Sequence, residues 1–175
     1  MICLFVDSLI CSTRINKSTN PRINTKMKDI VRILQDIAEA QNLTYHYGKK
    51  AALNLLDGTL EPDKVFLLHE YTNRKSEYNA SGTQIVAANY DGKFFLVKHS
   101  DLDQHYFAER GGWVNSKYTA NIEPLLTTFR NIGNSLACNG IEIAQWDNID
   151  VTDALDANMD GLLCSYRIRI PVNHG

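Results

Sequence analysis

The stretch DNIDVTDALDANMDGLLCSYRIRIPV, residues 147–172, decides the fold of this chain. Polar and apolar side chains alternate through its second half, as they do in a strand that has one face in a core. One face carries Leu163, Ser165, Arg167 and Arg169. The other face carries Cys164, Tyr166, Ile168 and Ile170. We therefore predict a final strand with a core face and an exposed face, ended by Pro171 and preceded by an acidic turn.

The acidic part of this stretch begins like a calcium-binding loop. Asp156, Asn158, Asp160 and Gly161 form the pattern D-x-N-x-D-G. A complete EF-hand loop also requires a bidentate glutamate at its twelfth position and a helix after it. Arg167 occupies the twelfth position and a strand follows, so calcium binding is not predicted. The pattern favours a turn instead, with Gly161 supplying a left-handed backbone that Asn158 and Asp160 also tolerate.

Two amphipathic helices are predicted upstream of the stretch. Met27–Gln41 places apolar residues at helical spacing, which makes one apolar stripe. The second helix takes Asn121 as its N-cap, carries Pro124 in its first turn and ends at Asn139-Gly140. Shorter helical pieces are predicted at Lys49–Leu56 and Thr152–Leu155.

Further strands are predicted before and after the second helix. Their patterns lie at Val65–Tyr71, Thr83–Tyr90, Lys93–His99 and Ile141–Trp146. The polar residues 72–78 are predicted to be the solvated end of the first of these strands, and Asp91-Gly92 is a strong signal for a hairpin turn between the next two. The resulting prediction is an α+β fold, a mostly antiparallel sheet of about five strands with two main helices packed on one face.

Composition describes an ordinary globular protein. The 175 residues are 44% hydrophobic and 22% charged, and one domain is the default at this length. The net charge of −2 argues against a dedicated nucleic-acid or membrane surface. The four cysteines have no paired spacing, so we predict reduced thiols and neither disulfides nor a zinc site.

The first 26 residues differ from the rest, so we predict an N-terminal extension or arm at 1–26 and a single α+β domain at 27–175. The apolar start MICLFVDSLIC has no preceding basic residue and no cleavage site, so it does not fit a signal peptide, and we predict a cytoplasmic protein. The polar residues that follow have the composition of a linker. Either they form an arm that docks on a neighbouring subunit, or Met27 is the natural start.

Candidate catalytic groups do not assemble into a recognisable set. His69 and Glu70 are neighbours on a strand and point to opposite faces. His99 and His105 lie near Asp101 and Asp103, but their spacing selects no metal geometry. Residues 92–99, GKFFLVKH, weakly resemble an RNA-binding strand, but adjacent Phe side chains point to opposite faces, so one belongs to the core. We predict no catalytic residue, no cofactor and no metal ligand.

The element order is the basis of a family resemblance. It is read from Met27–Gln41, Val65–His99, the helix YTANIEPLLTTFRNI (118–132) and the residues 141–172. These segments resemble the tail terminators of tailed bacteriophages and the related tail-completion and minor tail proteins. The family pattern is an N-terminal helix, a strand and hairpin, a long helix, a strand, a short turn and a last strand. Residues 1–26 lie outside the resemblance.

The resemblance implies a structural virion protein without catalytic residues. Such a protein forms a homohexameric ring that ends the tail tube and meets the head-side connector. The partners implied are further copies of the chain, the tube protein and the connector, with no membrane, and with DNA at most passing through the ring lumen. The location implied is the neck or tail of the virion, and the host cytoplasm during assembly.

Two further expectations concern specific residues. The acidic run is expected to form an assembly surface, in which Asp150, Asp153 and Asp156 face Arg167 and Arg169 of an adjoining copy. The alternative from another functional class is a nucleic-acid-associated or metal-dependent enzyme. It would use the aspartates together with His69, His99 and His105.

Overall fold

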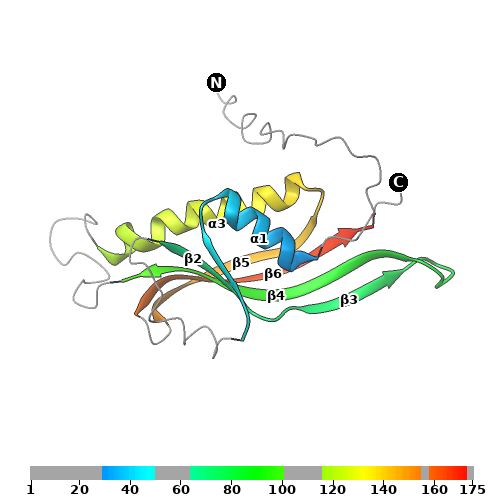
Figure 1. The fold of residues 1–175 in the computed structure, drawn as a ribbon, viewed down its shortest axis with the longest axis horizontal. Helices are drawn as coiled ribbons and strands as arrows, with labels where there is room; N and C mark the ends of the chain where they lie inside the picture. The colour runs from blue at the N-terminus through cyan, green and yellow to red at the C-terminus, as the bar shows by residue number, and fades with distance from the viewer. Residues whose placement is uncertain (1–28, 50–63, 101–115, 155–157, 173–175) are drawn as a thin grey trace, which may run out of the picture.

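The structure, a computed structural model, describes residues 29–49, 64–100, 116–154 and 158–172. They form two layers, a six-stranded sheet and a pair of helices that lie on one of its faces (Figure 1). The helices are α1 (Ile30–Ala40) and α3 (Glu123–Cys138), and a π-helical segment, η3 (Tyr118–Ile122), leads into α3. The predicted α+β class and the placement of the helices are confirmed.

The sheet is built around its two longest central strands. The strands are β1 (Thr44–Tyr47), β2 (Val65–His69), β3 (Asn73–Tyr78), β4 (Ile85–His99), β5 (Glu142–Ala154) and β6 (Met159–Pro171). Their order is β1-β2-β4-β6-β5, and β3 pairs with the N-terminal part of β4, beyond the end of β2. Among the strand pairs of the described ranges, only β1–β2 is parallel. The predicted final strand is β6, and its residues alternate in burial as expected.

The predicted turn at Asp91-Gly92 is wrong, because β4 runs through these two residues without a break. They pair with Arg167 and Tyr166 of β6. A side chain at position 92 would collide with the Tyr166 ring, so Gly92 is needed for close approach and not for a turn. The hairpin turn lies at residues 79–84 instead, where Gly82 has a φ of +70°. The polar residues before it, predicted as the end of another strand, are the separate strand β3.

The predicted start of the second helix is also wrong, although its end is confirmed. Ser116 acts as the cap, because its Oγ accepts a hydrogen bond from the Thr119 N–H at 3.2 Å. Asn121 lies inside η3 and is buried. At the other end Gly140 adopts a φ of +74°, the left-handed stop that the sequence predicts. The buried position of Asn121 gives it a different role, described below.

The sheet buries apolar side chains on both faces. The main core lies between the helices and the sheet and includes Phe94, Tyr166 and Trp146. The opposite face, here called the outer face, carries a smaller cluster of Phe66, Leu68, Phe95, Val97 and Met159. Phe94 and Phe95 point to opposite faces as predicted, but both are buried. Neither ring is therefore available to stack on bases.

The acidic segment before β6 is more extended than predicted. Residues 152–154 belong to β5 and do not form a helical turn. Asn158 has a φ of +49°, as predicted, whereas Gly161 lies in β6 and packs directly on the backbone of Leu96 and Val97. Asp156 and most of the helix predicted at Lys49–Leu56 lie outside the described residues.

No helix in the described ranges is long and apolar enough to cross a membrane.

Candidate functional site

The outer face of the sheet changes from apolar to polar along the strands. The polar half, here called the polar ladder, consists of Glu77, Asn89, Asp91, Glu142, Arg167 and Arg169. The strand register places these side chains in rows across β3, β4, β6 and β5, with Asn89 beside Arg169 and Arg169 beside Glu142. The strand alternation thus gathers charged groups from four strands into one surface.

Arg169 is the centre of the polar ladder. Its Nε and Nη2 lie 2.8 and 3.1 Å from the two carboxylate oxygens of Glu77, and its Nη1 lies 2.8 Å from Glu142 Oε1. The hydrogen bonds from Arg169 and then from Asn89 hold the pKa of the Glu77 carboxyl below its usual value. One guanidinium therefore ties the edge strand β3 to the edge strand β5.

Arg167 is paired in the same way. Its Nε lies 2.8 Å from Asp91 Oδ1, and its side chain remains 61% exposed. Both arginines that we expected to contact a neighbouring copy thus have acidic partners within their own chain. Their contact with another copy stays a prediction.

A shallow depression of about 480 Å³ lies beside the polar ladder. It forms where β4 changes its partner from β2 to β3. Polar and apolar surface contribute about equally to its lining, which consists of Glu70, Tyr71, Asn73, Asp91, Gly92, Lys93, Gln145, Ser165 and Tyr166. The wide opening and mixed charge make it part of the surface relief and not an enclosed ligand cavity.

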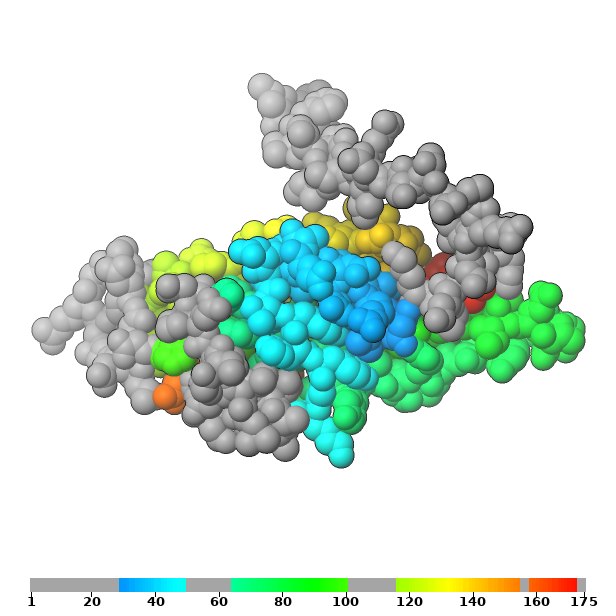
Figure 2. All heavy atoms as spheres, viewed as in Figure 1, coloured from blue at the N-terminus to red at the C-terminus, as the bar shows by residue number. Residues whose placement is uncertain are grey.

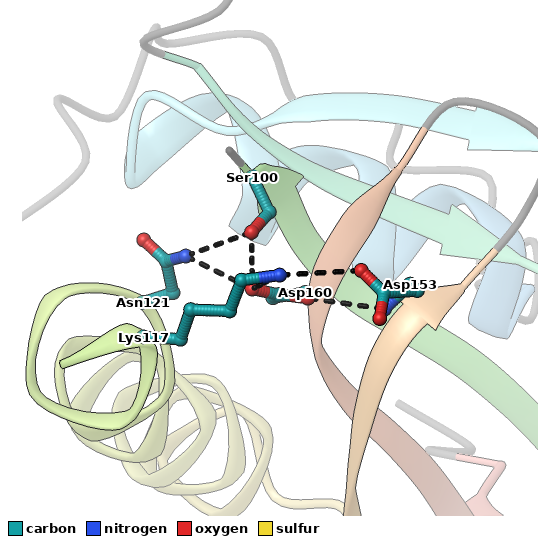
Figure 3. Close-up of polar contacts among 5 residues, drawn as sticks. All are labelled: Ser100, Lys117, Asn121, Asp153 and Asp160. Carbon is teal, nitrogen blue, oxygen red and sulfur yellow. Dashed lines mark hydrogen bonds and ion pairs between the residues drawn. The ribbon is translucent and has the colours of Figure 1, made fainter. Parts of the chain in front are cut away.

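Asp160 is the centre of a buried polar cluster (Figure 3). Its carboxylate is fully buried and accepts hydrogen bonds from the Ser100 hydroxyl, from Asn121 Nδ2 at 3.2 Å and from the Asp153 N–H at 3.1 Å. Lys117 Nζ lies 3.8 Å from the same carboxylate and 3.2 Å from Asp153 Oδ1. The cluster joins the end of β4, the entry to η3 and the β5–β6 connection.

This cluster is suited to holding the fold together and not to catalysis. A buried carboxylate is tolerated only when it is hydrogen-bonded and paired with a cation, and both conditions are met at Asp160. The Ser100 hydroxyl donates to the carboxylate, so its proton is directed away from any substrate. The D-x-N-x-D-G pattern thus ends in a structural anchor. Asp153, one of the predicted interface residues, belongs to it with half of its side chain exposed.

His69 is the centre of a second buried polar chain. Its Nδ1 and Nε2 each lie 2.7 Å from a tyrosine hydroxyl, those of Tyr45 and Tyr166. The Tyr166 hydroxyl donates to Thr72 Oγ1 at 3.0 Å, and Thr72 donates to the Asp91 carbonyl at 2.9 Å. Burial lowers the pKa of His69 to about 4 and raises the pKa of both tyrosines. At neutral pH the His69 and tyrosine side chains of this hydrogen-bonded series are therefore uncharged.

The depressed pKa of His69 predicts a loss of stability in acid. The unfolded chain takes up a proton on His69 near pH 6.5, whereas the folded chain resists protonation until about pH 4. The contribution of His69 is therefore complete above pH 6.5, and we expect it to fall by roughly 3 kcal/mol as the pH drops to 4. Urea unfolding of wild type and His69→Gln at pH 7, 5.5 and 4 measures this, because only wild type has a buried imidazole that takes up a proton on unfolding. A stability difference between the two proteins that is the same at all three pH values would contradict it.

Of the histidines of the enzyme alternative, the two that the structure describes do not come together. His69 is enclosed by tyrosines, His99 is exposed at the far end of β4, and His105 lies outside the described residues. Within the described ranges no group of three or more His, Cys, Asp or Glu side chains is arranged to hold a metal ion. No observation on these residues favours the enzyme alternative.

Several side chains of the polar ladder and the Asp160 cluster were not singled out by the sequence analysis. Glu77 lies in β3, a separate strand that the sequence pattern does not distinguish from the end of the strand before it. Lys117 is buried, and nothing in the sequence marks a buried lysine. Glu142 was within reach of prediction, since it is the second residue of the predicted strand Ile141–Trp146, whose neighbour carries Arg169. Of the remaining predicted interface residues, Asp150 lies on β5 beside Leu162, and Asp156 lies outside the described residues.

Comparisons with known proteins do not assign the chain to a family. No protein-family model matches it, and no curated protein matches it.

Proposed function

We propose that this chain is a structural protein of the neck or tail of a tailed bacteriophage. It assembles as a homohexameric ring that ends the tail tube and presents a surface to the head-side connector, with DNA passing through the lumen. In this role the protein carries no catalytic residue and needs no cofactor. It acts in the virion and assembles in the host cytoplasm.

The order of the elements supports this proposal. Helix α1, strand β2, the β3–β4 hairpin, helix α3, strand β5, a short turn and strand β6 follow the order that the family resemblance implies. The hairpin lies at a different place in the sequence than predicted, but it occupies the same position in that order. The additional short strand β1 extends one edge of the sheet.

The observation that carries the proposal is the pair of unlike edges of the sheet. In the part of the chain that the structure describes, one edge is β5, and the other is formed by β1 and β3. A ring requires a heterologous contact, in which one surface of each copy meets a different surface of the next. Two different strand edges on opposite sides of one protomer meet this requirement.

The expected result is a discrete oligomer in solution. Size-exclusion chromatography with light scattering should give a mass of about 119 kDa, six copies of the 19.8 kDa chain, and electron micrographs should show rings. The measurement is made over a range of concentrations, with and without tail tube protein of the same phage. A 19.8 kDa species under all these conditions, with no rings on tube ends, would contradict the proposal.

A further inference from the structure

We infer that neighbouring copies join edge to edge, with β5 of one protomer pairing antiparallel with β3 of the next. The contact places Asp147 opposite Lys75 and extends the sheet from copy to copy. This inference rests on the proposed ring, because it names the contact that would close it.

Both strands have a partner on one side only. Within the described ranges β5 pairs with β6 alone, and β3 pairs with β4 alone. Each therefore presents a row of backbone N–H and C=O groups that another strand can use. The β3–β4 hairpin also extends past the helices at one end of the molecule, so its outer edge is not covered by them (Figures 1 and 2).

The direction of the strands fits an antiparallel contact. Going from β3 to β4, β6 and β5, each strand is antiparallel to the one before. Three such steps make β3 and β5 run in opposite directions. When a second copy continues the sheet in the same orientation, its β3 therefore lies antiparallel to β5 of the first copy. This is the pairing type of almost the whole sheet.

The regular parts of the two strands match in length. β5 has register shifts between Ile143 and Gln145 and again after Val151, and β3 has one between Glu77 and Tyr78. The regular segment of β3, residues 73–77, fits against residues 145–149 of β5, which lie between the two shifts. In the neighbouring copy, β1 covers the edge of β2 as far as His69. The proposed contact therefore does not continue along β2, and it ends near Ile149 of β5.

This register matches the charges of the two edges. β5 contains four carboxylates and neither lysine nor arginine, whereas β3 contains Arg74 and Lys75. Asp147 and Lys75 both lie on the outer face, because their sheet partners Ser165 and Asn89 do. Placed opposite each other they form a cross-strand ion pair. Glu77, the one acidic residue of β3, is held by Arg169 and faces the neutral Gln145.

The same register brings together two exposed apolar side chains. Ile149 is 62% exposed and Tyr71 is 59% exposed. Ile149 lies opposite Asn73 in the proposed pairing, which puts Tyr71 at the diagonal position within reach of a large side chain. Edge pairing thus buries both of them.

Charge exchange tests the contact in the full-length chain. Lys75→Glu or Asp147→Lys alone should raise the dissociation constant of the oligomer about tenfold or more, since each puts like charges opposite each other at every interface. The double variant restores opposite charges between copies and should recover association. The control pair is Arg130→Glu and Asp36→Lys, two exposed residues on the helices α3 and α1, and it should leave association unchanged.

Cysteine cross-linking tests the register directly. Asn73→Cys with Ile149→Cys, in a chain whose four native cysteines are replaced by serine or alanine, should give a ladder of disulfide-linked oligomers without reductant, ending at the ring. Gln35→Cys with Ile149→Cys is the control and should remain uncross-linked.

The outcomes separate this inference from the proposed function. An oligomer that forms, but is insensitive to charge exchange and gives no cross-linked ladder, overturns the edge contact and leaves the ring standing. A chain that stays monomeric with and without tube protein overturns both. Loss of association in both single variants, with recovery in the double variant, supports the contact, and failure of the double variant to recover while it remains folded by circular dichroism counts against it.

Discussion

The Asp160→Ala protein is expected to be roughly 3–5 kcal/mol less stable than wild type, since it removes the buried carboxylate of a charge and hydrogen-bond cluster. Lys117 is only 5% exposed and loses one of its two carboxylates. The Ser100 hydroxyl and the Asn121 amide lose the acceptor that both share. Urea unfolding at pH 7 measures the loss, and thermal unfolding should show a midpoint lower by about 10 °C.

Two further variants show whether the buried charge is the cause. Asp153→Asn removes the other carboxylate near Lys117, but its side chain is half exposed, so the expected loss is at most about 1 kcal/mol. Lys117→Met should recover part of the loss when it is combined with Asp160→Ala, because the buried cation, which Asp160→Ala deprives of one of its two carboxylates, is then absent. Equal losses for Asp160→Ala and Asp153→Asn would show that burial of the carboxylate does not matter.

Gly161→Ala is expected to lower the free energy of unfolding about as much as Asp160→Ala does, by about 3 kcal/mol or more. A Cβ at this position would overlap the Leu96 carbonyl and lie 2.8 Å from Val97 Cα. Both atoms belong to the backbone of β4, so the overlap is relieved only by separating β4 from β6. These two strands form the centre of the sheet. Urea unfolding at pH 7 measures the effect.

Gly48→Ala is the matched control for this substitution. Nothing lies within 4 Å of a Cβ at position 48, and Gly48 does not have a positive φ. Adding a methyl group there restricts the unfolded chain without a clash, so stability should be unchanged or slightly higher. A loss at Gly161 no larger than the change at Gly48 would contradict the close contact between β4 and β6.

Asp160 and Gly161 show what a local sequence motif can predict and what it cannot. Their pattern resembles the start of a calcium-binding loop. The sequence itself argues against calcium binding, because Arg167 stands where the loop needs a glutamate. The neighbouring sequence does not indicate the contacts that these two residues make in the structure. Asp160 meets Asn121, thirty-nine residues earlier in the chain, and Gly161 meets the backbone of β4. Both contacts depend on how β4 and β6 are paired.

The hairpin error has a similar cause. An Asp-Gly pair between two apolar runs is a strong local signal for a turn. At Asp91-Gly92 the signal is overridden because Gly92 makes room for Tyr166 across the sheet. β3 and β1 went unpredicted for a related reason, since both are short edge strands whose residues carry little strand pattern of their own.

The sequence by itself determined the α+β class, the two amphipathic helices, the alternating final strand and the left-handed stop at Gly140. These features depend on periodicity and backbone preference, which act over a few neighbouring residues. Only the tertiary structure decided that β4 is continuous, that Arg169 links two edge strands, and that Asp160 and His69 are buried with their partners. Such features depend on strand register, because register sets which distant side chains meet, and no single segment contains that information.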